Sequence, residues 1–195
     1  MNLRLAPAGL ALLLALPFAA ALAAPQEKAR DEVLVLFGQR RVTLAVPAGF
    51  MFSSDKDERG LITARLGDPP EKISLQISFL PDTAGEFATP RGRKEFLVQT
   101  FQRYVAGSVE QAMQFEELEP RAGAGTYCIF TDQDLVGKTS FPPGEYLHAT
   151  TGLKTWRGCL AVFTLMSNST SSDEYRAAMR LLRDSLVEPP LTPLR

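Results

Sequence analysis

Histidine, cysteine and tryptophan are scarce in this chain, and their scarcity limits the chemistry it can support. The 195 residues include one histidine, two cysteines and one tryptophan. Zinc sites are built mainly from Cys and His, and a structural site needs about four ligands, one more than these two residue types supply in the whole chain. We therefore expect no metal site and no cofactor.

The chain also lacks an excess of positive charge. Its 21 Lys and Arg residues are balanced by 22 Asp and Glu residues, which gives a formal net charge of −1. A nucleic-acid-binding protein needs a basic excess to neutralise phosphates. The composition therefore predicts that nucleic acid is not a partner.

Only one long hydrophobic run is present, and it lies at the N-terminus. A positively charged start is followed by apolar residues 5–22, and the run ends in Ala21-Leu22-Ala23, a small-x-small pattern. These features are typical of a secretory signal peptide. Two prolines interrupt the run and polar residues follow it, which disfavours a transmembrane anchor. We expect cleavage near Ala23 and a periplasmic or secreted mature protein without a transmembrane anchor.

Periodicity divides the rest of the chain. Residues 73–79 alternate strictly between apolar and polar, which predicts a strand with one face in the core and the other wet. Further strands are predicted at residues 32–37, 40–46, 61–66, 114–118, 126–135, 145–156 and 159–166. The last is apolar on both faces, which favours a central place in a sheet.

Two helices are predicted from their starting signals. Thr89-Pro90 is a cap followed by proline at the first helical position, and Gly107 is a plausible end of that helix. Residues 171–174 have the pattern of a capping box. The buried stripe of this second helix would consist of Tyr175, Ala178, Met179, Leu182 and Leu186.

Strands and helices do not alternate regularly, so the fold class is α+β. We expect an antiparallel β-sheet of about six to seven strands flanked by helices. The predicted organisation is a signal peptide over 1–23, a polar leader over 24–31, a single domain over 32–188 and a tail over 189–195.

Cys128 and Cys159 fall in two predicted strands with another strand between them. Disulfides persist in exported proteins, so a bridge between them is possible. Strands two apart are separated by about 9.5 Å, which exceeds the Cα–Cα span of a disulfide. The alternative is that both cysteines are small apolar core residues.

The order of elements and two segments resemble the PsbP-like superfamily, which includes the Ran-binding Mog-type proteins and the DcrB-type bacterial exported proteins. Residues 42–50 (VTLAVPAGF) are similar to the opening strand of that family, and residues 172–182 (SDEYRAAMRLL) are similar to its final helix. The resemblance implies a PsbP-like α/β/α sandwich. It also implies a protein that binds or assembles other proteins and carries no shared catalytic residues.

Two loops hold the candidate binding residues. Trp156 and Arg157 lie at a predicted strand end, and Lys138 and Phe141 lie in a loop that contains Pro-Pro. Trp and Arg are favoured at interface hot spots. The alternative is that Trp156 closes the edge of the core.

Three other motifs favour a structural interpretation over a functional one. His148 is a candidate base for a hydrolase, but its strand pattern favours a surface or packing residue. Glu116, Glu117 and Glu119 are typical of a solvated acidic face. Residues 55–60 resemble the start of a calcium loop, but an arginine at its fifth position favours a hairpin turn.

These observations favour an exported bacterial envelope protein that acts as a non-enzymatic protein-binding or assembly factor, with an envelope protein as its partner. Two alternatives stay open: a small-ligand binder with a cleft between sheet and helix, and a periplasmic hydrolase that uses His148.

Overall fold

The computed structural model describes residues 28–68 and 72–188. The predicted signal peptide (1–23) and C-terminal tail (189–195) lie outside the described residues, as does the first half of the predicted leader. Neither helix of the described part is long and apolar enough to cross a membrane.

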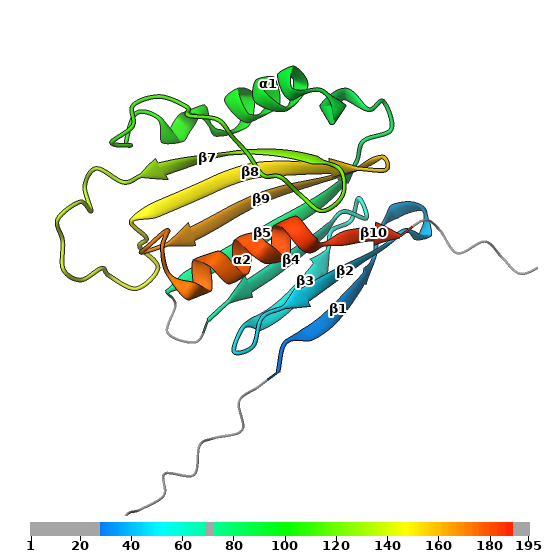
Figure 1. Cartoon of the computed structure of the whole chain (residues 1–195), viewed down its shortest axis with the longest axis horizontal. Helices are drawn as coiled ribbons and strands as arrows, with labels where there is room; N and C mark the ends of the chain where they lie inside the picture. The colour runs from blue at the N-terminus through cyan, green and yellow to red at the C-terminus, as the bar shows by residue number, and fades with distance from the viewer. Residues whose placement is uncertain (1–27, 69–71, 189–195) are drawn as a thin grey trace, which may run out of the picture.

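A seven-stranded antiparallel sheet forms the centre of the molecule (Figure 1). Its strand order is β3-β4-β5-β9-β8-β7-β6, so β9 holds the central position that its apolar sequence predicts. The strands are β3 (Met51–Lys56), β4 (Ile62–Gly67), β5 (Ile73–Pro81), β6 (Glu116–Glu117), β7 (Ala124–Thr131), β8 (His148–Trp156) and β9 (Cys159–Ser167).

A second, three-stranded sheet consists of β1 (Arg30–Val35), β2 (Arg41–Val46) and β10 (Leu186–Glu188), in the order β1-β2-β10. The turn between β1 and β2 is a short 3-10 segment, η1 (Phe37–Gln39). The inner side of this small sheet is buried and carries Leu34, Val42, Leu44 and Val187. On the outer side of the small sheet, the β1 residues Val33 and Val35 are about half exposed (54% and 47%).

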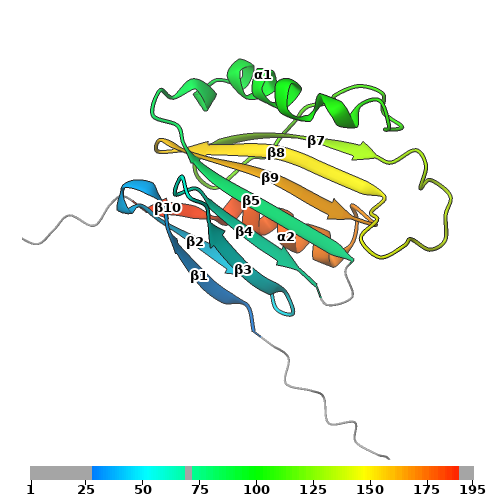
Figure 2. The ribbon, with the colours of Figure 1, turned by 180° about the vertical axis from the view of Figure 1, so that it is seen from behind.

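The two helices lie on opposite faces of the large sheet (Figure 2). Helix α1 (Pro90–Phe101) packs over β7 and β8, preceded by η2 (Glu86–Ala88) and followed by η3 (Gln102–Tyr104). Helix α2 (Asp173–Asp184) lies on the other face, beside β2 and β5. The structure therefore confirms the α+β class and an antiparallel sheet flanked by helices.

The main core lies between the large sheet, α2 and the small sheet, because apolar side chains from all three gather there. A smaller cluster under α1 includes Leu97, Phe101, Leu153 and Leu160. Beyond α1, this same face of the sheet is polar, and Ser74 and Gln76 of β5 are exposed. The alternation in residues 73–79 therefore marks one core face and one wet face, as predicted.

Several predicted boundaries were wrong. Strand β1 begins at Arg30, inside the predicted leader, and α1 ends at Phe101 instead of continuing to Gly107. β7 ends at Thr131 and β8 begins at His148, so the loop between them is longer than expected. β3 and β10 were not predicted. Leu186 therefore belongs to a strand and is exposed, instead of extending the buried stripe of α2.

The possible disulfide is absent from the structure, because Cys128 and Cys159 are free and buried. As predicted, β8 separates their strands. Cys128 pairs with Thr151 and Cys159 pairs with Trp156, five residues further along β8. That offset adds about 16 Å along the strand to the distance across two strands, far beyond the reach of a disulfide.

Candidate functional site

The four predicted binding residues do not form one surface. Trp156 and Arg157 lie at the β8–β9 turn, and Lys138 and Phe141 lie in the β7–β8 loop at the opposite end of β8 (Figure 1). Eight steps along β8 separate its two ends by about 26 Å. Lys138 is exposed and Phe141 is half-buried.

Trp156 is only 5% exposed, which matches the alternative that it closes the edge of the core. Lys154, two residues earlier on the same face of β8, places its ammonium 4.9 Å from the centre of the indole ring. With Arg157 and β10, Trp156 lines a cavity of about 330 Å³. Its two charged residues, Arg157 and Glu188, have opposite signs, so the cavity favours no ligand class.

Lys154 is 1% exposed, a burial that the sequence analysis missed. Its ammonium donates to the carbonyls of Leu182 (3.0 Å), Arg183 (2.9 Å) and Ser185 (2.6 Å) at the C-terminus of α2. Burial lowers the pKa of Lys154 to about 8. The carbonyls at the C-terminus of a helix lack hydrogen-bond partners within the helix, and the Lys154 ammonium supplies a donor to three of them. Lys154 therefore stabilises the packing of α2 against the sheet.

His148 begins β8 and is half-buried, and burial lowers its pKa. Its Nδ1 lies 3.2 Å from Oγ1 of Thr131, and that hydroxyl donates to Glu110 at 2.7 Å. In a catalytic triad the histidine takes the proton from the nucleophile. Here the hydroxyl proton points to the carboxylate, so the arrangement does not resemble an activated nucleophile.

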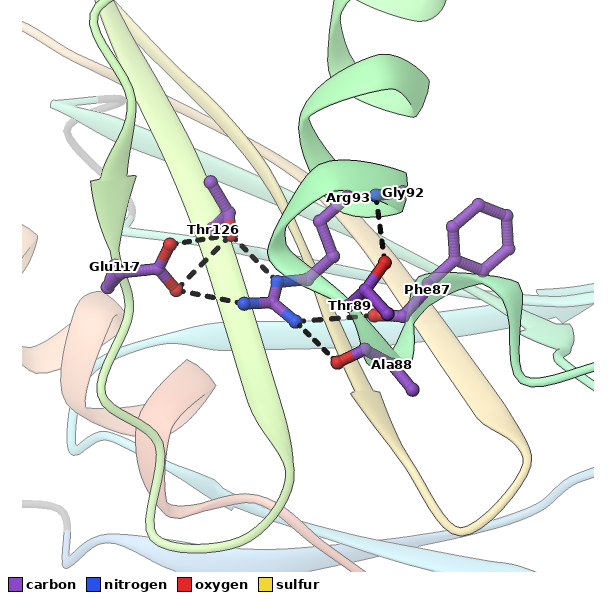
Figure 3. A network of polar contacts seen from close by, with 7 residues as sticks. All are labelled: Phe87, Ala88, Thr89, Gly92, Arg93, Glu117 and Thr126. Carbon is purple, nitrogen blue, oxygen red and sulfur yellow. Dashed lines mark hydrogen bonds and ion pairs between the residues drawn. The ribbon is translucent and has the colours of Figure 1, made fainter.

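One member of the acidic run anchors helix α1 (Figure 3). The guanidinium of Arg93, a residue that is 3% exposed, donates to Thr126 (2.8 Å) and Glu117 (3.1 Å) on one side. On the other side it donates to the carbonyls of Phe87 and Ala88, at 3.3 and 3.0 Å. Glu117 therefore has a structural role, and the interpretation of a purely solvated acidic face was incomplete.

A cleft between sheet and helix exists, as the small-ligand alternative requires. It lies between η3 and the ends of β7, β8 and β9, and Tyr104, Phe130 and Met166 line its apolar part. Its volume is about 180 Å³. Pockets that enclose drug-sized ligands measure about 300–1,000 Å³, so this cleft is small for that purpose.

The most distinctive surface is a groove between α2 and β7, which we call the arginine groove. Arg176, Arg180 and Arg183 line it from α2. They recur at i, i+4 and i+7 and so share one side of the helix, next to its buried stripe. The groove has a volume of about 370 Å³, and all three arginines are exposed.

The floor of the arginine groove is aromatic and apolar. Tyr127 and Ile129 reach it from β7, and Tyr175 reaches it from α2. The hydroxyl of Tyr127 donates to Glu116 at 2.6 Å, and the hydroxyl of Tyr175 bonds Oγ1 of Thr150 at 2.9 Å. Burial raises the pKa of both tyrosines, so both phenols stay neutral at physiological pH.

The three guanidinium groups differ in the hydrogen bonds and ion pairs that they make. Arg176 pairs with Asp173 at 2.6 Å, and Nε of Arg183 donates to the carbonyl of Leu118 at 3.0 Å. The side chain of Arg180 makes no hydrogen bond or ion pair within the part of the chain that the structure describes. Glu116 and Asp173 are the acids that these contacts bring to the groove, so it keeps an excess of positive charge.

Sequence reasoning missed this groove, although its signal was present. Arginine at residues 176, 180 and 183 follows the helical period, one position after the buried residues 175, 179 and 182. What the sequence could not show is that β7 lies opposite this side of α2. Within the described residues there is no cluster of three or more His, Cys, Asp or Glu side chains that could hold a metal.

No family model matches the chain, and no curated protein matches it with significant similarity.

Proposed function

We propose that this protein is an exported factor of the bacterial envelope that binds another protein and carries out no chemistry itself. Export rests on the N-terminal sequence, and protein binding rests on the arginine groove. The single observation that carries the proposal is the exposed guanidinium of Arg180, which makes no hydrogen bond or ion pair within the described residues and lies above an aromatic floor.

The residue types in the arginine groove support binding and not catalysis. Arginine and tyrosine are enriched at hot spots of protein interfaces. Arginine carries a planar fork of donors that stays charged at every physiological pH. The phenols of Tyr127 and Tyr175 are hydrogen-bonded to neighbours and have raised pKa values, so neither serves as a base or a nucleophile.

Site-specific photo-crosslinking in the organism that makes the protein tests this function. A photoreactive residue replaces Thr170, a half-buried residue at one end of the groove. The matched control carries the same residue at Gln76, which is exposed on the opposite, polar face of the sheet. We expect one discrete protein adduct from position 170 and none from position 76.

Two results would count against the proposal. Identical adducts from both positions would show that collisions, and not the groove, produce them. Absence of an adduct at position 170, with the protein folded and present in the envelope, would contradict a protein partner at this site.

A further inference from the structure

We propose that the arginine groove binds an extended, acidic segment of the partner protein, with carboxylates at alternate positions. This inference rests on the function proposed above and adds the chemistry of the partner.

The charge of the arginine groove is local and does not reflect the protein as a whole. The chain has a net charge of −1, so its surface is not basic overall. Against that background, three arginines follow one side of α2, and among the described residues their contacts and those of the groove floor bring in two acids, Glu116 and Asp173. The site therefore favours an anionic ligand.

The free donors favour carboxylates at a defined spacing. Among the residues that the structure describes, the side chain of Arg180 makes no hydrogen bond, and that of Arg183 makes one, from Nε to the carbonyl of Leu118. Residues three apart on a helix have Cβ atoms about 5–6 Å apart. Alternate residues of an extended chain are about 6.6 Å apart and point to the same side. Two acidic side chains at positions i and i+2 therefore match the two guanidinium groups, each as a forked ion pair.

The shape of the site favours a chain segment over a membrane surface. The arginines border a groove with a floor of Ile129, Tyr127 and Tyr175, and a bilayer surface cannot enter such a concave site. The intervening residues of an extended peptide can cover that floor. Recognition of acidic motifs by arginine clusters is a recurrent mode of peptide binding.

A direct binding measurement tests the inference. The probe is a fluorescent peptide, Gly-Asp-Ser-Asp-Ser-Asp-Gly, and its control has Asn in place of each Asp. Binding to the purified protein is followed by fluorescence anisotropy. We expect Arg180→Gln to weaken binding of the acidic peptide about tenfold, because it removes one charge-assisted pair. Arg180→Lys, which keeps the charge but loses the fork, should bind with intermediate affinity.

Arg91→Gln is the matched control, because Arg91 is an exposed arginine on α1, far along the chain from the groove, that pairs with Glu95. We expect its affinity for the acidic peptide to equal that of the unmodified protein. The side chain of Arg180 makes no hydrogen bond or ion pair within the described residues, so its substitution should leave the fold intact, and the urea midpoint verifies this.

Three outcomes would overturn the inference: equal binding of the Asn peptide, loss of binding in Arg91→Gln as large as in Arg180→Gln, or binding to anionic phosphatidylglycerol vesicles without binding to the acidic peptide. If position 170 still crosslinks to a protein while the acidic peptide fails to bind, the inference fails and the proposed function stands. If both measurements fail, the proposed function fails too.

Discussion

Charged side chains fix the tertiary structure at two points that the sequence patterns did not single out. Lys154 and Arg93 are almost fully buried, and each satisfies several acceptors at once. Sequence patterns treat a lysine or arginine as exposed because burying an unpaired charge is costly. Here the acceptors come from segments far away in the chain, so no local pattern could reveal the pairing.

Replacing Lys154 with Met should destabilise the protein strongly. The methionine retains much of the apolar stem but leaves carbonyls of Leu182, Arg183 and Ser185 without their shared donor. We expect a loss of about 3 kcal/mol in the free energy of unfolding, measured by urea denaturation. The exposed Lys56→Met serves as the control and should change stability by less than about 0.5 kcal/mol. A similar small change for Lys154→Met would contradict the anchoring role.

The buried thiols predict a pH dependence. Burial raises the pKa of Cys128 and of Cys159 from 9.0 to about 12. A group whose pKa is raised by folding stabilises the folded state fully below its unfolded pKa, and this stabilisation is lost as pH rises towards the folded value. Stability should therefore fall as pH increases from about 9 towards about 12.

The thiol contribution can be isolated by comparing the unmodified protein with a variant that carries Cys128→Ala and Cys159→Ala. Between pH 7.5 and pH 10, the unmodified protein should lose on the order of 2 kcal/mol more of its unfolding free energy than the variant. In urea, both thiols should react with a thiol reagent, since the structure leaves them unbridged. Equal losses in the two proteins would refute the raised pKa values.

At the scale of elements, helix starts and alternating strands were predictable, and irregular strands were not. The Thr89-Pro90 signal located α1, and Thr89 accepts a hydrogen bond from the backbone of Gly92 at 3.1 Å. Alternation located β5. In contrast, β3 is almost entirely exposed, and β10 has only three residues, so neither shows a periodic pattern. Their pairing depends on neighbouring strands, which a local window does not contain.

The cap of α2 provides a test at this scale. Ser172 is the N-cap, and its hydroxyl accepts from the backbone of Tyr175 at 3.1 Å. Tyr175 therefore holds the third helical position, where the capping-box prediction favoured Glu174. Ser172→Ala should cost about 1 kcal/mol of unfolding free energy, whereas the neighbouring Ser171→Ala should cost little. The reverse order in urea denaturation would place the cap at Ser171.

The arginine groove could be predicted only in part. The helical spacing of arginines 176, 180 and 183 is visible in the sequence, but the groove also needs β7 on the opposite side. The predicted pair Trp156 and Arg157 does lie at a strand end, as expected. Because that tryptophan is buried against Lys154, its sequence position alone did not reveal whether it was available to a partner.

At the scale of the whole molecule, export is the first premise of the proposed function. If the N-terminal segment is a signal peptide, the mature protein begins at Ala24. Mass spectrometry of the protein isolated from its own organism should then give a mass that lacks residues 1–23. A mass that includes Met1 or the apolar run would contradict cleavage near Ala23.

The most direct test of the central claim is to map the binding of the acidic peptide on the whole protein by nuclear magnetic resonance. Backbone amide shifts are followed as the alternating Asp peptide is added. We predict that the largest changes lie at residues 176–183 of α2 and 127–129 of β7, on the two sides of the arginine groove. Changes confined to the Trp156 cavity, the cleft beside η3 or the outer side of β1 would contradict binding in the arginine groove.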